Sequence, residues 1–74
     1  METLTVEYQF SHGKRPRGFG AWWLKLTGTD NEGRYTEEAY QITDTLAAAK
    51  TRAVKRMKEG VGGVKKVVRI EVLP

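Results

Sequence analysis

The sequence contains no cysteine and only one histidine among its 74 residues. Without cysteine the chain has no disulfide, no thiolate metal site and no cysteine nucleophile, and it suits a reducing cytoplasm. No apolar run approaches the roughly 20 residues that a membrane-spanning helix requires, so we expect no membrane association. These absences predict a cytoplasmic chain, and its length predicts one small domain over residues 1–74.

The residues that usually carry catalysis are sparse and poorly placed. His12 lies in a basic turn, and no acid lies near it in the sequence to orient its imidazole ring. Glu37 and Glu38 would point to opposite faces of a strand, so they do not form a carboxylate pair. The glycines of Gly60–Gly63 follow a predicted helix, whereas a phosphate-binding loop precedes one. We therefore expect a non-enzymatic protein with no catalytic residues, no metal and no cofactor.

Alternation of apolar and polar residues predicts three strands in the first part of the chain. These strands cover Leu4–Phe10, Phe19–Leu26 and Arg34–Ile42. Adjacent side chains of a strand face opposite sides, so Trp22 and Trp23 cannot both lie in the core. Trp22 shares its phase with two leucines and is expected inside, which leaves Trp23 on the open face.

The second part of the chain predicts a helix followed by a strand. Apolar residues recur at helical spacing over Leu46–Glu59, and Thr43 or Thr45 can cap the helix N-terminus. Glycines end this helix and allow a sharp return into a last strand over Val64–Leu73. The expected core phase of that strand comprises Val68, Ile70 and Val72.

These elements predict an α+β fold with two layers. The order is β-β-β-α-β, with one amphipathic helix packed on one face of a small, mainly antiparallel four-stranded sheet. The crossover helix leaves the last strand parallel to either the first or the third strand, and we favour a place beside the first. The other face of the sheet stays open.

Charge is segregated along the chain, although the net charge is only +4. The turn His12–Gly18 contains three cations and no acid, and Leu46–Gly60 contains five cations against Glu59. Between them, Thr27–Asp44 holds five acids against Arg34 alone. Such segregation creates local fields, and local fields select polyanionic partners.

Two surfaces are candidates for contacting such a partner. The first combines the basic turn with the open sheet face, and its residues are Lys14, Arg15, Arg17, Trp23, Lys25 and Arg34. The second is the basic side of the helix, formed by Arg52, Lys55, Arg56 and Lys58. A straight duplex would not reach both, so we expect only one of them to bind. Trp23 suits stacking on nucleic acid or anchoring of a protein partner, and the basic turn could instead fold back and cover it.

A strand with glycine and two tryptophans, Gly18–Leu26, is followed by an aspartate–threonine helix start and an alanine-rich segment, Asp44–Lys50. In these features Arg17–Gly60 resembles the three-stranded-sheet-plus-helix DNA-binding domain of plant ethylene-response factors and of the arm-binding domains of tyrosine integrases. The resemblance implies that the open sheet face enters the DNA major groove. The residues that it places on DNA are Trp23, Lys25 and Arg34 at sugar, phosphate or base edges, and Lys14, Arg15 and Arg17 at the flanking backbone.

The sequence thus predicts a small nucleic-acid-binding protein that favours duplex DNA, which it contacts through a basic hairpin loop and the open sheet face. The alternative is a protein-binding inhibitor or regulator, of the kind found among phage or plasmid accessory proteins, that docks its basic surface on an acidic groove of a nucleic-acid enzyme. The acidic stretch Asp30–Asp44 favours this alternative slightly, because it would repel a duplex. We expect a monomer, or a homodimer formed through an exposed edge strand.

Overall fold

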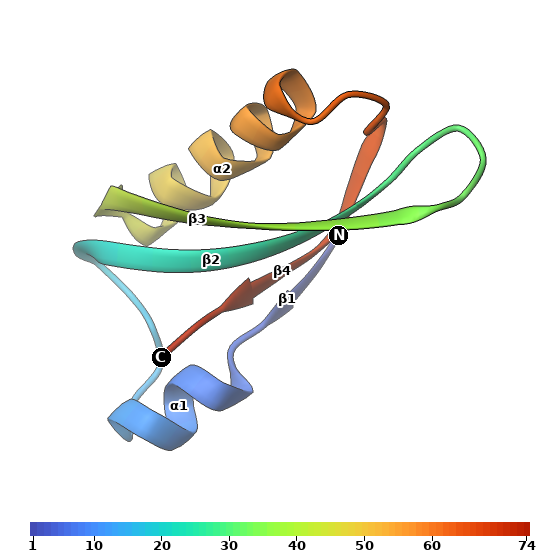
Figure 1. Cartoon of the computed structure of the whole chain (residues 1–74). Coiled ribbons are helices and arrows are strands. Elements are labelled where there is room, and N and C mark those ends of the chain that lie inside the picture. Colours follow the sequence, from blue (N-terminus) through green and yellow to red (C-terminus); the bar gives the residue numbers. More distant parts are fainter.

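The computed structural model describes all 74 residues and contains one four-stranded sheet and two helices (Figure 1). The elements in chain order are β1 (Glu2–Leu4), α1 (Val6–His12), β2 (Phe19–Thr29), β3 (Tyr35–Thr45), α2 (Leu46–Gly60) and β4 (Lys66–Val72). The predicted α+β class and the mainly antiparallel four-stranded sheet are confirmed. Neither helix is both long and apolar enough to cross a membrane.

The strands lie in the order β1-β4-β2-β3. β4 runs parallel to β1 and antiparallel to β2, which confirms that the last strand lies beside the first. The long β2–β3 hairpin is closed by Asp30, whose Oδ1 accepts hydrogen bonds from the backbone N–H groups of Glu32 at 2.8 Å and Arg34 at 2.9 Å. β3 is an edge strand, so its outer side has no partner within the chain.

The predicted first strand, Leu4–Phe10, is wrong. Only Glu2–Leu4 lies in a strand, and a short helix follows it directly. The rings of Tyr8 and His12, four residues apart on α1, stack with centroids 4.1 Å apart, and the Tyr8 ring lies 5.6 Å from that of Trp22. The 13–18 segment therefore joins a helix to β2, and it is not the predicted basic hairpin loop.

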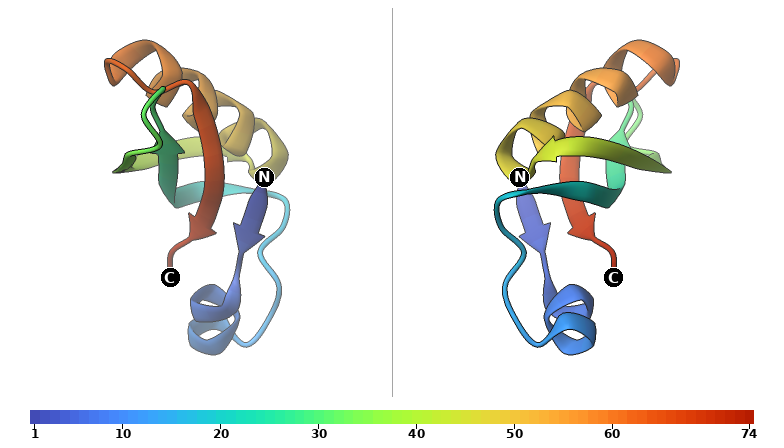
Figure 2. Two further views of the ribbon diagram at one scale, coloured as in Figure 1. Left: turned by 90° about the vertical axis from the view of Figure 1, so that its right-hand side faces the viewer. Right: turned by 90° about the vertical axis from the view of Figure 1, so that its left-hand side faces the viewer.

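A second layer is formed by α2, which packs on one face of the sheet and encloses the core. Figure 2 shows α2 across the strands at one end of the molecule and α1 at the other end. The core consists of Trp22, Leu24, Leu26, Ile42, Ala49, Ala53, Met57, Val64, Val67, Ile70 and Val72. The predicted inward phase of β2 and the predicted apolar side of α2 are thus confirmed.

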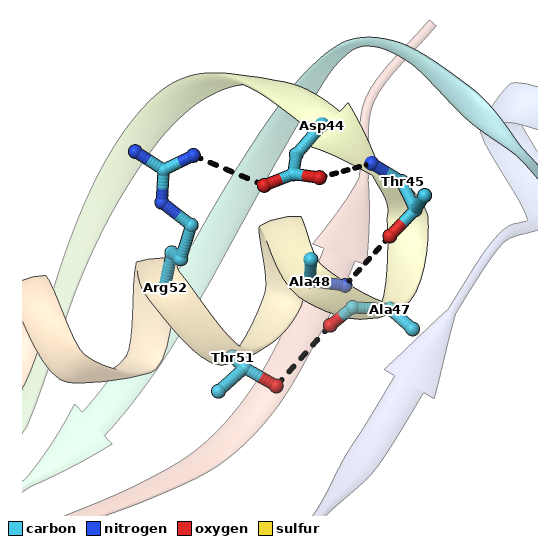
Figure 3. Close-up of polar contacts among 6 residues, drawn as sticks. All are labelled: Asp44, Thr45, Ala47, Ala48, Thr51 and Arg52. Carbon is cyan, nitrogen blue, oxygen red and sulfur yellow. Dashed lines mark hydrogen bonds and ion pairs between the residues drawn. The ribbon is translucent and has the colours of Figure 1, made fainter.

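The N-terminus of α2 is held by the cap that the sequence predicts. The Thr45 Oγ1 accepts a hydrogen bond from the Ala48 N–H at 3.3 Å (Figure 3). Asp44 accepts from the Thr45 N–H at 2.7 Å and pairs with Arg52 at 3.1 Å. The bonds from the Thr45 and Ala48 N–H groups satisfy donors that have no partner within the helix, so the helix begins at a defined residue.

A β-bulge changes the predicted core phase of β4. Thr27 pairs with Arg69, but Gly28 pairs with Val67, so Val68 is the extra residue on β4. A bulge shifts the alternation of side chains by one position. Val67 therefore lies in the core in place of the predicted Val68, which is only half-buried. The strand is also shorter than the predicted Val64–Leu73.

Candidate functional site

A hollow of about 490 Å³ opens where α1, the 13–18 segment and the start of β2 meet. Lys14, Arg15 and Arg17 of the segment line it together with His12 of α1 and Trp23 of β2. We call this hollow the loop pocket. Its lining residues come from α1, from the 13–18 segment, from the start of β2 and from the chain after β4. Figure 1 shows where these elements lie.

The loop pocket surrounds a free edge of β2. β4 ends at Val72 opposite Leu24, so the residues of β2 before Leu24 have no paired strand on that side. The last bond across this edge runs from the Leu73 N–H to the Trp23 C=O at 2.9 Å. Backbone groups alternate in direction along an antiparallel strand, so the N–H and C=O of Ala21 also point to the free edge. Because the pocket wraps around an edge, Trp22 and Trp23 both line it from opposite faces.

The basic segment is anchored at its end by Gly18. The carbonyl oxygen of Gly18 accepts hydrogen bonds from the Trp22 Nε1–H at 3.1 Å and from the Leu46 N–H at 2.9 Å. Gly18 adopts a φ of 78°, a left-handed conformation in which a side chain would be strained. The segment is therefore tied to the core through Trp22 and to the start of α2 through Leu46.

The cations of the loop pocket have no carboxylate partner. Lys14, Arg15 and Arg17 are exposed, and none of them takes part in the five ion pairs of the structure. Trp23, with 48 % of its surface exposed, lies in the same hollow. The predicted basic turn and the predicted open-face tryptophan are thus brought together.

Lys25, by contrast, is neutralised on the open sheet face. Its Nζ lies 3.2 Å from Glu71 and 3.7 Å from Glu37. The hydrogen bond to Glu71, followed by the charges of Glu71 and Glu37, raises the pKa of Lys25 above its ordinary value. Lys25 faces Glu71 directly across the β2–β4 ladder, so sheet register imposes this pairing.

Arg34 and Arg52 are also paired and lie outside the loop pocket. Arg34 contacts Glu32 at 3.0 Å in the β2–β3 turn, at the opposite end of β2 from the basic segment. Arg52 contacts Asp44 at 3.1 Å (Figure 3). The rest of the predicted basic helix side, Lys55, Arg56 and Lys58, is exposed and takes part in no ion pair.

The sequence reasoning did not include Tyr8, His12 and Phe19 among the site residues, although all three line the loop pocket. Phe19 is 73 % exposed and occupies the same strand phase as Trp23, so alternation along β2 could have identified it. The four-residue spacing of Tyr8 and His12 signals stacking only if the segment is helical, whereas the sequence predicts a strand for Tyr8 and a turn for His12.

Neither a metal site nor a known relative suggests a function. Histidine, aspartate and glutamate side chains do not gather in any group of three that could hold a metal ion. No protein-family model, curated protein or solved structure matches the chain. The functional argument therefore rests on the geometry and charge of the loop pocket.

Proposed function

We propose that this protein binds nucleic acid through the loop pocket, without catalysing a reaction. Lys14, Arg15 and Arg17 contact phosphates, and Trp23 contacts a base or sugar. The observation that carries the proposal is that three unpaired cations and a half-exposed tryptophan share one hollow. Phosphate contacts supply most of the affinity in such complexes, and aromatic stacking adds to it without demanding a particular base.

The charge arrangement favours the loop pocket over the rest of the sheet face. Glu37 and Glu71 flank Lys25 on the open face, and Arg69 of β4 pairs with Glu2 at 3.8 Å. A polyanion placed there would displace existing ion pairs and approach carboxylates. At the loop pocket it would meet cations that have no competing partner.

Fluorescence anisotropy with labelled oligonucleotides tests the proposal. Three phosphate contacts predict a slope of log K against log salt of about −2.1 on a single strand or −2.7 on a duplex. Affinity should then fall roughly 20- to 40-fold between about 50 and 200 mM salt. Replacing Lys14, Arg15 and Arg17 together by alanine should weaken binding and nearly flatten this dependence.

A matched control separates the loop pocket from net charge. Replacing Lys55, Arg56 and Lys58 by alanine removes an equal number of positive charges, three, from α2 and leaves the loop pocket intact. This variant should keep most of the affinity and the wild-type slope. Equal losses in both variants would contradict the assignment to the loop pocket, and no salt-sensitive binding at micromolar protein would refute the function.

One observation favours a second candidate, a regulator that docks on an acidic groove of a nucleic-acid enzyme. Phe10 and Val6 on α1 are 91 % and 74 % exposed, and apolar side chains of this kind suit a protein contact beside a basic surface. A pull-down with and without nuclease distinguishes the candidates. A partner retained after nuclease treatment, combined with no binding of pure protein to nucleic acid, would favour the regulator.

A further inference from the structure

We propose that the loop pocket receives an unpaired base of a single strand, so that single-stranded nucleic acid, rather than a duplex, is the preferred ligand. This inference rests on the proposed function, because it assumes that phosphates bind the basic segment. It adds the strandedness of the ligand and the position of the base. Its basis is the arrangement of Phe19, Ala21 and Trp23 along the free edge of β2.

Phe19 and Trp23 both line the loop pocket, with a small residue between them in the strand. Their positions, four residues apart in one strand, place their Cα atoms about 13 Å apart. Ala21 lies midway in the same phase and is exposed, so no large side chain fills the interval. A base stacked between two rings requires about 7 Å from ring to ring, twice the spacing of stacked bases. The interval is wider than this, so it can accept a base that stacks on the Trp23 ring, with Phe19 on the far side of Ala21.

The free edge of β2 supplies polar groups for such a base. The N–H and C=O of Ala21 point away from β3 and have no β4 partner, since the ladder to β4 begins at Leu24. A base edge carries donors and acceptors in its own plane and can pair with these backbone groups. In a duplex the bases are stacked on one another and their pairing edges are occupied, so a base cannot enter the hollow beside β2.

The cations complete the site on one side only. Lys14, Arg15 and Arg17 border the pocket along the segment that precedes Phe19, where they can follow the phosphates of a strand whose base lies over Ala21. Beyond Trp23 the open face continues to Lys25, which is flanked by Glu37 and Glu71. A duplex lying flat on the sheet would bring a second row of phosphates against these carboxylates. A single strand crossing at the pocket avoids them.

The test compares four ligands of equal length in anisotropy titrations: mixed-sequence single-stranded DNA, the matching single-stranded RNA, the DNA duplex, and a DNA strand whose central positions are abasic. We expect both intact single strands to bind more tightly than the duplex. The abasic strand keeps its phosphates, so it should retain the salt slope but lose affinity. The two intact strands reveal any preference between DNA and RNA.

Side-chain variants then locate the base. Trp23→Ala should weaken single-strand binding by roughly 5- to 150-fold, the range expected for one base–aromatic stack. It should weaken binding of the abasic strand much less. Tyr35→Ala is the matched control, because Tyr35 is 71 % exposed at the other end of β2–β3 and lies outside the loop pocket. Trp23→Phe, which keeps a ring, should bind within a few-fold of wild type but lose the part of the fluorescence quenching that Trp23 contributes, leaving only the signal of the buried Trp22.

The outcomes separate this inference from the function on which it rests. Equal binding of duplex, abasic and intact strands, with a salt slope that depends on Lys14, Arg15 and Arg17, would overturn the base pocket and leave nucleic-acid binding intact. Absence of binding to every ligand would overturn both. Binding of an acidic peptide such as oligoglutamate, with the same dependence on Trp23 and no binding of nucleic acid, would assign the pocket to a protein segment instead.

Discussion

Replacing Gly28 by alanine should destabilise the fold, because Gly28 lies at the β-bulge where α2 and the start of β4 converge. A Cβ atom added at Gly28 would lie 2.8 Å from the Val64 Cγ1, 3.1 Å from the Met57 Cε and 3.3 Å from the Lys66 carbonyl oxygen. Val64 is buried and β-branched, so its rotamer is restricted, and the carbonyl belongs to the backbone of β4. Neither group can move away without shifting the strand.

The expected size of this effect follows from two opposing contributions. Overpacking of a close-packed core costs about 1–3 kcal/mol. Replacing glycine by alanine lowers the conformational entropy of the unfolded chain and offsets about 0.4–1 kcal/mol of that cost. The net loss for Gly28→Ala should be about 1–2 kcal/mol, which corresponds to a Tm lowered by roughly 5–15 °C for a domain of this size.

Gly20→Ala is the matched control, since Gly20 lies on the same strand. A Cβ atom there would contact only the Trp22 ring, at 3.7 Å and beyond, which is an ordinary van der Waals separation. The entropic contribution then acts almost alone, and the variant should be neutral or more stable by up to about 1 kcal/mol. Urea unfolding followed by circular dichroism measures both variants. A Gly28→Ala protein as stable as Gly20→Ala would refute the packing argument for the bulge.

Three further predictions concern the cap, the core and the pH dependence. Thr45→Ala should cost about 1 kcal/mol in urea unfolding and Thr45→Ser almost nothing, because serine keeps the bond to the α2 N-terminus; equal losses would exclude the cap as the cause. Met57→Ala should cost about 2–5 kcal/mol by the same measurement, since Met57 is fully buried; a loss below about 1 kcal/mol would show that this end of α2 is loosely packed. The folded-state pKa of Tyr40 is raised by burial and then by the charge of Glu38, and that of Lys25 is raised by its carboxylate partners. Both contributions to stability are present below the unfolded pKa values and are lost as the pH rises above about 10 through the folded pKa values. The urea concentration at the unfolding midpoint should therefore fall as the pH rises. It should fall less steeply in Tyr40→Phe and in Lys25→Met. Unchanged pH slopes in both variants would contradict this assignment.

The parts of the fold that the sequence predicts correctly are those with strong local signals. α2 combines an apolar side of about four turns with a threonine cap, and its start is found at the predicted residue. In β2 the shared phase of Trp22, Leu24 and Leu26, opposite to that of Ala21, Trp23 and Lys25, identifies the buried face. Each of these features is determined within a few residues, so tertiary contacts reinforce the local preference and do not reverse it.

The prediction of a strand over Leu4–Phe10 is wrong because the pattern of this segment fits two structures. Apolar residues at 4, 6, 8 and 10 alternate as in a strand, but pairs four residues apart also share a side of a helix. The pattern did not reflect burial: Val6 and Phe10 are largely exposed, and only Tyr8 packs against the core. With β4 inserted between β1 and β2, the first strand needs to pair over only three residues, and the chain is free to turn into α1.

Charge clustering predicts unpaired cations correctly only where the cations lie outside the sheet ladders. Lys25 and Glu71 are 46 positions apart in the sequence, and they meet because β4 pairs with β2 in one particular register. No local pattern reveals that register, and the bulge at Val68 alters it further. Lys14, Arg15 and Arg17 belong to a segment that pairs with no strand, so no carboxylate is brought opposite them by pairing. A cation run in a connecting segment therefore predicts a free positive surface better than the same residues in a strand, where pairing decides which charges survive.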